Sequence, residues 1–221
     1  MNERTADETL IAPRFLFRFS APLLHHAPLW KASGVQLGEQ YRMLQLAELD
    51  GERTFGDVRA AWSDEGLAFN LRVEGKRQPL WCRDSRLEDS DGLQVWIDTR
   101  DTHNVHRASR FCHRFMFMPG GGRKATDPVA DQLIINRARE NARSIRPQDL
   151  RVRSEIRPTG YTLEGCIPAA AMTGFEPAEH PRLGFTYAIY DRELGLQTYS
   201  AGTEYPYDED PSVWSTLEMV K

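Results

Sequence analysis

The chain has 221 residues, with 28 basic and 32 acidic side chains and a net charge of −4. This length suits one all-β domain with a substantial core, and the balanced charge lacks the basic excess of a nucleic-acid-binding face. No apolar run approaches the roughly 18 residues of a membrane span, so neither nucleic acid nor a membrane is an expected partner.

The first residues are polar and acidic, without the basic and apolar regions of a secretory signal. The three cysteines, Cys82, Cys112 and Cys166, are far apart and odd in number. Free thiols in a reducing compartment are the plain interpretation, which predicts a cytoplasmic protein unless a leader has been removed from a longer precursor. Residues 1–12 are expected to form a flexible tail, and residues 13–221 a single domain.

Segments in which apolar and polar residues alternate, each typical of a strand, recur along the whole domain. Strands are expected at 14–20 and 41–49, as a hairpin over 56–74, and at 90–98, 111–118, 150–157, 161–167, 183–191, 197–202 and 215–220. Residues 22–38 and 76–88 are expected to be loops, residues 129–143 a short surface helix or loop, and residues 168–173 a short helical turn. Ten or so strands with short turns and little helix predict an antiparallel β-sandwich.

The segment 90–98, S-D-G-L-Q-V-W-I-D, alternates most cleanly, so its two sets of side chains point to opposite faces of a sheet. The sets are Leu93, Val95 and Ile97 on one face, and Gln94, Trp96 and Asp98 on the other. The first set suits a buried core. The second combines polar groups with a large aromatic ring, which predicts a face that looks toward a ligand.

Aromatic side chains on loops, or on the outer face of strands, are candidates for a sugar site. They are Trp81, Trp96, Tyr199, Tyr205, Tyr207 and Trp214. Sugar rings stack on such rings while planar polar groups take their hydroxyls, and Gln94 and Arg114 have the strand parity to supply those groups beside Trp96. The competing interpretation is that Trp96 and Arg114 stack on each other as a cation–π pair.

A histidine and cysteine cluster suggests a second kind of site. His103, His106 and Cys112 offer ligands that zinc accepts, and they form the basis of a metal- or cofactor-dependent alternative. Adjacent residues on a strand point to opposite faces, so Cys112 and His113 are not expected to share one site. The parity of His113 predicts a hydrogen-bonded histidine in the core.

Acidic residues surround the segment 90–98. Asp89, Asp91 and Asp98 are expected either to accept hydrogen bonds from loop amides or to bind a structural calcium ion, which prefers oxygen ligands. Carboxylates are also plentiful enough for a glycosidase pair, although no pair is marked by its surroundings. No cofactor is therefore certain, and calcium stays a possible one.

Six segments occur in an order that resembles the family 9 carbohydrate-binding modules and the wider DOMON-like β-sandwich group. They are V-R-A-A-W-S-D-E-G-L-A-F-N-L-R-V, D-G-L-Q-V-W-I-D, H-R-F-M-F, G-Y-T-L-E-G-C-I-P, L-G-F-T-Y-A-I-Y-D and D-P-S-V-W-S-T-L-E-M. The resemblance covers about residues 57–221. It implies an all-β, DOMON-like sandwich of the immunoglobulin-like jelly-roll type, with an N-terminal extension.

The resemblance also implies a site. In sugar-binding members, two tryptophans sandwich a sugar at the end of a chain, and a glutamate and an arginine bind its hydroxyls. Arg114 matches the arginine, and Gln94 stands where the glutamate is expected. The first sandwich ring is expected near Leu87 or Glu88, where no tryptophan stands; Trp81 lies six residues before Leu87. Tyr207 or Tyr205 stands near the second position.

These observations favour a non-catalytic carbohydrate-binding protein, connected with carbohydrate catabolism, whose partner is a saccharide. Its ligand residues would be Gln94, Trp96, Arg114, Trp81, Tyr205 and Tyr207. The alternatives are a metal- or cofactor-dependent enzyme, related to glycoside hydrolases or not, and a protein-interaction domain whose exposed aromatics form an interface.

Overall fold

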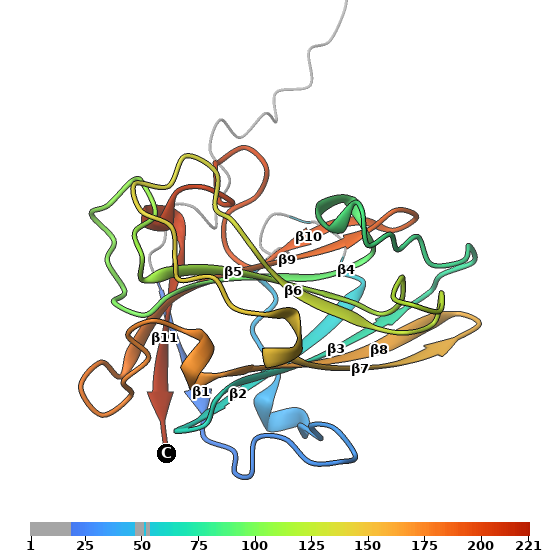
Figure 1. Ribbon diagram of the computed structural model, residues 1–221, viewed down its shortest axis with the longest axis horizontal. Coiled ribbons are helices and arrows are strands. Elements are labelled where there is room, and N and C mark those ends of the chain that lie inside the picture. The colour runs from blue at the N-terminus through green and yellow to red at the C-terminus, as the bar shows by residue number, and fades with distance from the viewer. Residues whose placement is uncertain (1–18, 47–50, 52–53) are drawn as a thin grey trace, which may run out of the picture.

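A computed structural model describes residues 19–46, 51 and 54–221 and shows two β-sheets packed face to face (Figure 1). The larger sheet runs in the order β1 (Ser20–Leu24), β11 (Ser215–Val220), β9 (Arg182–Asp191), β4 (Gly92–Asp98), β5 (Cys112–Met118) and β6 (Val129–Leu133), with β10 (Gly195–Thr198) beside β9. The smaller sheet runs β2 (Gly56–Ser63), β3 (Gly66–Glu74), β8 (Gly160–Pro168) and β7 (Arg151–Arg157). The predicted β-sandwich is confirmed.

Helical structure in the described residues is limited to short 3-10 turns, none long and apolar enough to cross a membrane. The turns are η2 (Glu39–Tyr41), η4 (Leu87–Asp89), η5 (Pro147–Asp149), η6 (Ala169–Ala171) and η7 (Pro211–Val213). The short turn expected over 168–173 is η6. The free thiols are also confirmed, since Cys82, Cys112 and Cys166 are all unpaired.

The core lies between the sheets and follows from the alternation of the strands. Leu93, Val95 and Ile97 of β4 are fully buried there, as their parity predicts. Gly165 of β8 faces the same layer, and a Cβ at this position would lie 2.8 Å from two ring carbons of Phe117 in β5. The close approach of the two sheets at this point therefore depends on a residue without a side chain.

The first strand differs from its prediction. The expected strand 14–20 lies mostly outside the described residues, and β1 instead occupies Ser20–Leu24, where a loop was expected. It pairs in parallel with β11, and it forms the edge of the larger sheet. An edge strand tolerates Pro22 because one side of its backbone needs no partner.

Two other predictions differ from the structure, one of them only in part. The strand expected at 41–49 is replaced by η2 and a single bridge between Arg42 and Arg59; residues 47–50 lie outside the described part. The helix or loop expected at 129–143 begins with strand β6, which pairs with β5. The backbone of β5 supplies the hydrogen bonds that define β6. Ala130 is the one buried side chain of β6, so the strand shows no clear alternation of apolar and polar residues.

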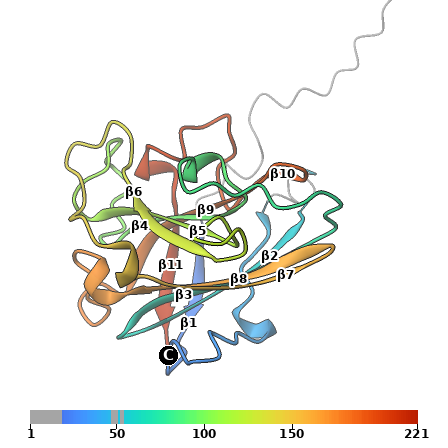
Figure 2. The same cartoon turned by 45° about the vertical axis from the view of Figure 1, so that its right-hand side comes forward.

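Loops cover the outer faces of both sheets. Loops lie above β4, β5 and β9 (Figure 1 and Figure 2). A second apolar cluster on this side of the larger sheet includes Trp96, Ile135, Tyr207 and Trp214. Below β2 and β3, the segment 25–41 packs its own small cluster against the smaller sheet (Figure 1). The outer face of β4 is consequently an internal layer rather than an open surface, which corrects the expectation of a face that looks directly at a ligand.

Candidate functional site

Arg114 is the centre of a polar cluster on the outer face of the larger sheet. It stands on β5 opposite Trp96 of β4. Its Nε and Nη2 donate to Oε1 of Gln94 at 3.1 and 2.7 Å, and its Nη1 donates to Oε1 of Glu88 at 2.9 Å and to the carbonyl oxygen of Ile134 at 3.3 Å. Nε2 of Gln94 donates in turn to the carbonyl oxygen of Glu88 at 3.1 Å. We call Gln94, Trp96, Arg114 and Glu88 the Arg114 cluster.

Trp96 is the floor of this cluster. Its ring is fully buried, the guanidinium carbon of Arg114 lies 5.1 Å from the ring centroid, and Tyr207 meets it edge-on at 5.6 Å. The indole Nε1 donates to the carbonyl oxygen of Asp208 at 3.1 Å. The cation–π alternative is therefore confirmed, and in this conformation Trp96 presents no free ring face to a sugar.

Residues 199–214, which we call the covering loop, close this layer. The Tyr207 hydroxyl pairs with that of Tyr190 on β9 at 2.9 Å, and Nε1 of Trp214 donates to the Tyr207 carbonyl oxygen at 2.7 Å. Burial is the main cause that raises the pKa of Tyr207 well above its ordinary value. Tyr205 is only half-buried at the edge of the loop. Of the two tyrosines expected at the site, Tyr205 is thus the one within reach of solvent.

Glu88 is a site residue that the sequence reasoning missed. Its side chain is 56% exposed, whereas that of Arg114 is 5% exposed. It therefore forms the solvent side of the ion pair between them. The signal was its place in an acidic run directly before β4, but nothing in a loop sequence shows that 3-10 turn η4 folds back over the strand.

Trp81 lies apart from the Arg114 cluster. It is half-buried on the loop between β3 and β4, and its ring contacts the guanidinium groups of Arg83 and Arg192, whose carbons lie 5.2 and 5.1 Å from the ring centroid. We call Trp81, Arg83 and Arg192 the Trp81 cluster. The structure thus brings Gln94, Trp96, Arg114 and Tyr207 together. Trp81 lies outside this group.

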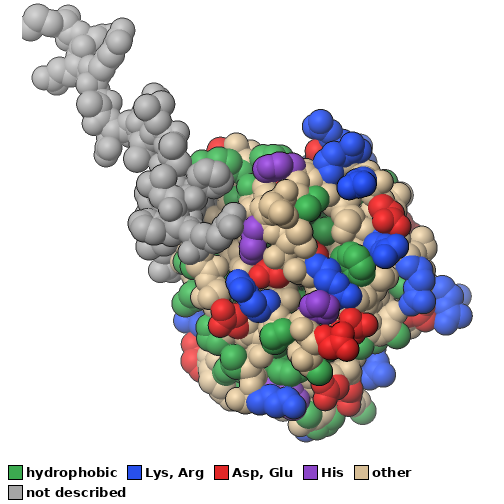
Figure 3. Space-filling view, turned by 90° about the vertical axis from the view of Figure 1, so that its left-hand side faces the viewer, with side chains coloured by type: hydrophobic (Ala, Val, Ile, Leu, Met, Phe, Trp, Pro, Cys, Tyr) green, Lys and Arg blue, Asp and Glu red, His purple; other side chains and the backbone are tan. Residues whose placement is uncertain are grey.

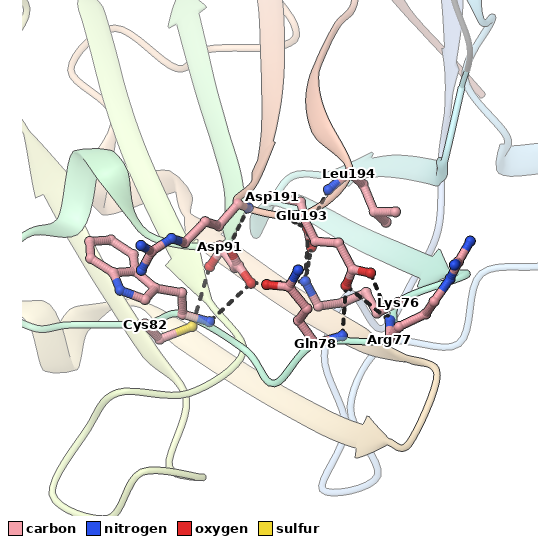
Figure 4. A network of polar contacts seen from close by, with 10 residues as sticks. Lys76, Arg77, Gln78, Cys82, Asp91, Asp191, Glu193 and Leu194 are labelled. Atoms are coloured by element: carbon pink, nitrogen blue, oxygen red, sulfur yellow. Dashed lines mark hydrogen bonds and ion pairs between the residues drawn. The ribbon is translucent and has the colours of Figure 1, made fainter.

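A network of buried charges lies beneath the Trp81 cluster. Nζ of Lys76 contacts Oδ2 of Asp191 at 2.6 Å and Oδ2 of Asp91 at 3.1 Å, and all three side chains are almost fully buried (Figure 4). Burial by itself lowers the pKa of Lys76, but the hydrogen bonds and negative charges of the two aspartates outweigh it, so the pKa lies above its ordinary value. Asp91 is thereby engaged by an internal cation.

The three aspartates considered for calcium are not brought together. Asp91 belongs to the buried network, Asp98 accepts from the backbone N–H groups of Arg100 at 3.0 Å and Thr102 at 2.7 Å, and Asp89 is exposed. Burial raises the pKa of Asp98 despite those two hydrogen bonds. Asp98 follows the loop-amide interpretation. Within the described ranges, the one group of three closely spaced metal-ligand atoms belongs to largely exposed Glu176, Glu179 and His180.

The expected metal ligands His103, His106 and Cys112 are also separate. Nε2 of His103 contacts Oδ1 of Asp101 at 2.8 Å, whereas Nδ1 of exposed His106 contacts Oδ2 of Asp210 at 3.0 Å. Cys112 is buried, and burial raises the pKa of its thiol to about 12, so it is not a ready thiolate ligand. The alternative in which these three residues share a metal site therefore finds no support in their positions.

His113 lies in the core, as its parity predicts. Its ring stacks on that of Phe115 at 6.0 Å, and its Nε2 lies 3.4 Å from the carbonyl oxygen of Thr173. Burial lowers its pKa to about 4, so the imidazole is neutral at physiological pH.

Comparison with known proteins points to one fold. No family model and no curated protein sequence matches this chain. Among solved structures, a family 9 carbohydrate-binding module (CBM9) from Caldicellulosiruptor kristjanssonii in complex with cellotriose is 10% identical, with a TM-score of 0.58 over 91% of this chain and 93% of that one. Its complex with glucose gives the same identity and TM-score, over 91% and 96% of the two chains.

A putative carbohydrate-binding protein from Bacteroides uniformis is also 10% identical, with a TM-score of 0.52 over 91% and 98% of the two chains. At this identity the likeness concerns the fold. The chain has a β-sandwich like that of CBM9, as the order of its sequence segments predicts, and membership of the wider DOMON-like group stays a prediction.

Proposed function

We propose that this chain is a non-catalytic carbohydrate-binding domain whose hydroxyl-binding groups are those of the Arg114 cluster. The observation that supports it most is the shared fold with proteins that hold cellotriose and glucose, combined with an arginine, an amide and a carboxylate gathered on the outer face of β4 and β5. A fold hosts many functions, so the polar cluster is the part of this argument that belongs to the chain itself.

The chemistry of the cluster suits sugar hydroxyls. Each hydroxyl both donates and accepts, and Arg114 offers only donors while Glu88 offers only acceptors. Gln94 provides an amide where the resemblance implies a glutamate, and Glu88 brings a carboxylate to the same arginine from η4. In the proposed site, the carboxylate that β4 lacks is therefore supplied by the neighbouring turn.

The aromatic residues take different roles in this proposal. Trp96 supports the guanidinium of Arg114, and Tyr207 packs edge-on against Trp96. Half-buried Tyr205, which packs against the same apolar layer as Trp96, is the ring that we assign to ligand contact. Access to the face of Trp96 requires the covering loop to move.

Neither alternative function is favoured by a specific observation. The residues considered for a metal do not meet, as described above. On the face that Figure 3 presents, acidic and basic side chains are interspersed and hydrophobic side chains are scattered, whereas an interaction surface is marked by one contiguous apolar patch.

Isothermal titration calorimetry with glucose and cellotriose tests the proposal. We expect measurable binding of at least one of them by the wild-type protein. Glu88→Gln keeps the shape of the side chain but removes a charged hydrogen-bond acceptor, so it should weaken that binding by about tenfold or more.

The matched control is Glu155→Gln, which removes the same charge from an exposed position on β7 of the other sheet. It should bind like the wild type. Absence of binding to every mono- and oligosaccharide tried, from a protein shown to be folded, would contradict the proposal.

A further inference from the structure

The Trp81 cluster contains two arginines that stack on the same ring. Arg83 and Arg192 are both exposed, and in the described part of the chain neither guanidinium has a carboxylate partner. A guanidinium that stacks on an aromatic ring keeps its in-plane N–H donors free for another acceptor. Two such groups on one ring therefore concentrate unused, positively charged donors at one place on the surface.

Buried polar side chains hold this cluster in position. Oδ2 of Asp91 accepts from the backbone N–H of Trp81 at 3.1 Å, and its Oδ1 accepts from the backbone N–H of Arg192 at 2.8 Å. Oγ of the neighbouring Ser90, which is also fully buried, accepts from the backbone N–H of Arg83 at 3.0 Å. Two consecutive residues before β4 thus fix all three members of the cluster.

The buried charge network secures this arrangement from below. Lys76 joins Asp91 to Asp191, and Oδ1 of Asp191 accepts from the backbone N–H groups of Glu193 at 3.0 Å and Leu194 at 2.9 Å (Figure 4). The turn that carries Arg192 is therefore tied to the loop that carries Trp81, although the two are far apart in sequence. A binding group held this way loses little conformational entropy when it meets a ligand.

We propose that the Trp81 cluster is a subsite for an acidic sugar residue, one whose pyranose ring carries a carboxylate or a sulfate ester. This inference rests on the proposed carbohydrate-binding function and adds the class of ligand to it. Guanidinium groups bind carboxylates and similar oxyanions through paired, charge-assisted hydrogen bonds. A neutral sugar makes no comparable use of two unpaired positive charges, so the cluster favours an anionic one.

The test compares three probes by titration calorimetry at low salt: trigalacturonate, cellotriose and a sulfated disaccharide. We expect an acidic probe to bind at least tenfold more tightly than cellotriose, and the binding to weaken as sodium chloride is raised because the contacts lie near solvent. The carboxylate and sulfate probes show which acidic group the cluster prefers, and a preference for either one supports the proposal.

Three variants locate the effect. Arg83→Gln and Arg192→Gln should each weaken binding of the acidic probe by about tenfold or more, since each loses a charged pair of hydrogen bonds. Arg86→Gln is the matched control, because Arg86 is an exposed arginine of the same loop and its side chain has no described contact with Trp81. It should bind like the wild type.

The outcomes separate this inference from the function on which it rests. Binding of cellotriose that equals or exceeds binding of both acidic probes overturns the acidic subsite and leaves the carbohydrate-binding function standing. Loss of affinity in all three variants alike also overturns it, because the effect would then come from net charge. Failure of every probe overturns the proposed function together with the subsite.

Discussion

At the scale of single residues, Lys76 shows how a loop of this protein depends on charge rather than on apolar packing. Its ammonium group and the carboxylates of Asp91 and Asp191 are almost completely removed from water. Charges at such depth are tolerated only when they are paired and hydrogen-bonded. Removal of Lys76 would leave two buried carboxylates without a cation, so the lysine is the member on which the network most depends.

Lys76→Met is expected to destabilise the protein by about 3–5 kcal/mol, because it leaves two carboxylates buried without their cation. Urea unfolding followed by circular dichroism measures this loss. Arg72→Met is the control, since Arg72 pairs with Glu74 at a position that is 58% exposed; breaking such a pair costs at most about 1 kcal/mol. Equal losses in the two variants would contradict the role assigned to Lys76.

At the scale of elements, the distance between the sheets is set where β8 crosses β5. Gly165 and Phe117 occupy the contact, and a Cβ on Gly165 would lie far inside van der Waals distance of the ring. Replacing glycine by alanine in a strand ordinarily stabilises a protein slightly, by restricting the unfolded chain. Here the overlap with Phe117 acts in the opposite direction and is the larger effect.

Gly165→Ala is expected to lower the free energy of unfolding by about 1–3 kcal/mol, the usual cost of overpacking a core. Phe117→Leu removes the ring edge that the new methyl group meets. In a double-mutant cycle, alanine at 165 should therefore cost less in the Phe117→Leu background, with a coupling energy of about 0.5–3 kcal/mol. Strict additivity of the two changes would show that the contact does not set the spacing.

The strands themselves were largely predictable, and the exceptions have physical causes. β2, β3, β4 and β5 were all expected from alternation, because each buries one face in the core. β1 was not, since it contains Pro22 and is defined by its pairing with β11. β6 was not, because it too is defined by backbone pairing at a sheet edge. The alternation of apolar and polar residues indicates which side chains are buried. It does not identify strands that are defined only by hydrogen bonds to a neighbouring strand.

The candidate site was predictable only in part for a related reason. Strand parity placed Gln94, Trp96 and Arg114 on one face, and the structure brings them into contact. It did not show that the covering loop would bury Trp96, nor that Glu88 would reach Arg114. Both depend on loops that are ordered by long-range contacts, which no local sequence pattern encodes.

At the scale of the whole molecule, buried ionisable groups shape the response to acid. Burial lowers the pKa of His113 to about 4 in the folded protein, whereas the ordinary value of 6.5 applies in the unfolded chain. Between these two pKa values the unfolded chain binds a proton at His113 and the folded protein does not. The free energy of unfolding therefore falls as the pH drops from about 6.5 toward 4. Burial raises the pKa values of Asp98 and Glu164, which acts in the opposite direction because the folded state then holds the extra proton.

His113→Phe isolates the histidine contribution, because a phenyl ring keeps the stacking on Phe115 without a titrating group. Between pH 7 and pH 5, the wild-type protein should lose about 2 kcal/mol more stability than the variant. Urea unfolding at both pH values measures the difference. The control is His106→Gln, whose ring is 77% exposed; most of the acid-induced loss should remain in it. An identical pH dependence in His113→Phe and wild type would contradict the assignment.

The pairing of β1 with β11 has a consequence for how the protein is made. Translation delivers β1 early, whereas β11 comes at residues 215–220. Strands that are neighbours in space but distant in the chain form slowly, and partly folded chains expose unpaired edges during synthesis. The nascent chain thus carries β1 without its partner until β11 has been synthesised, and the larger sheet acquires this edge only after that point.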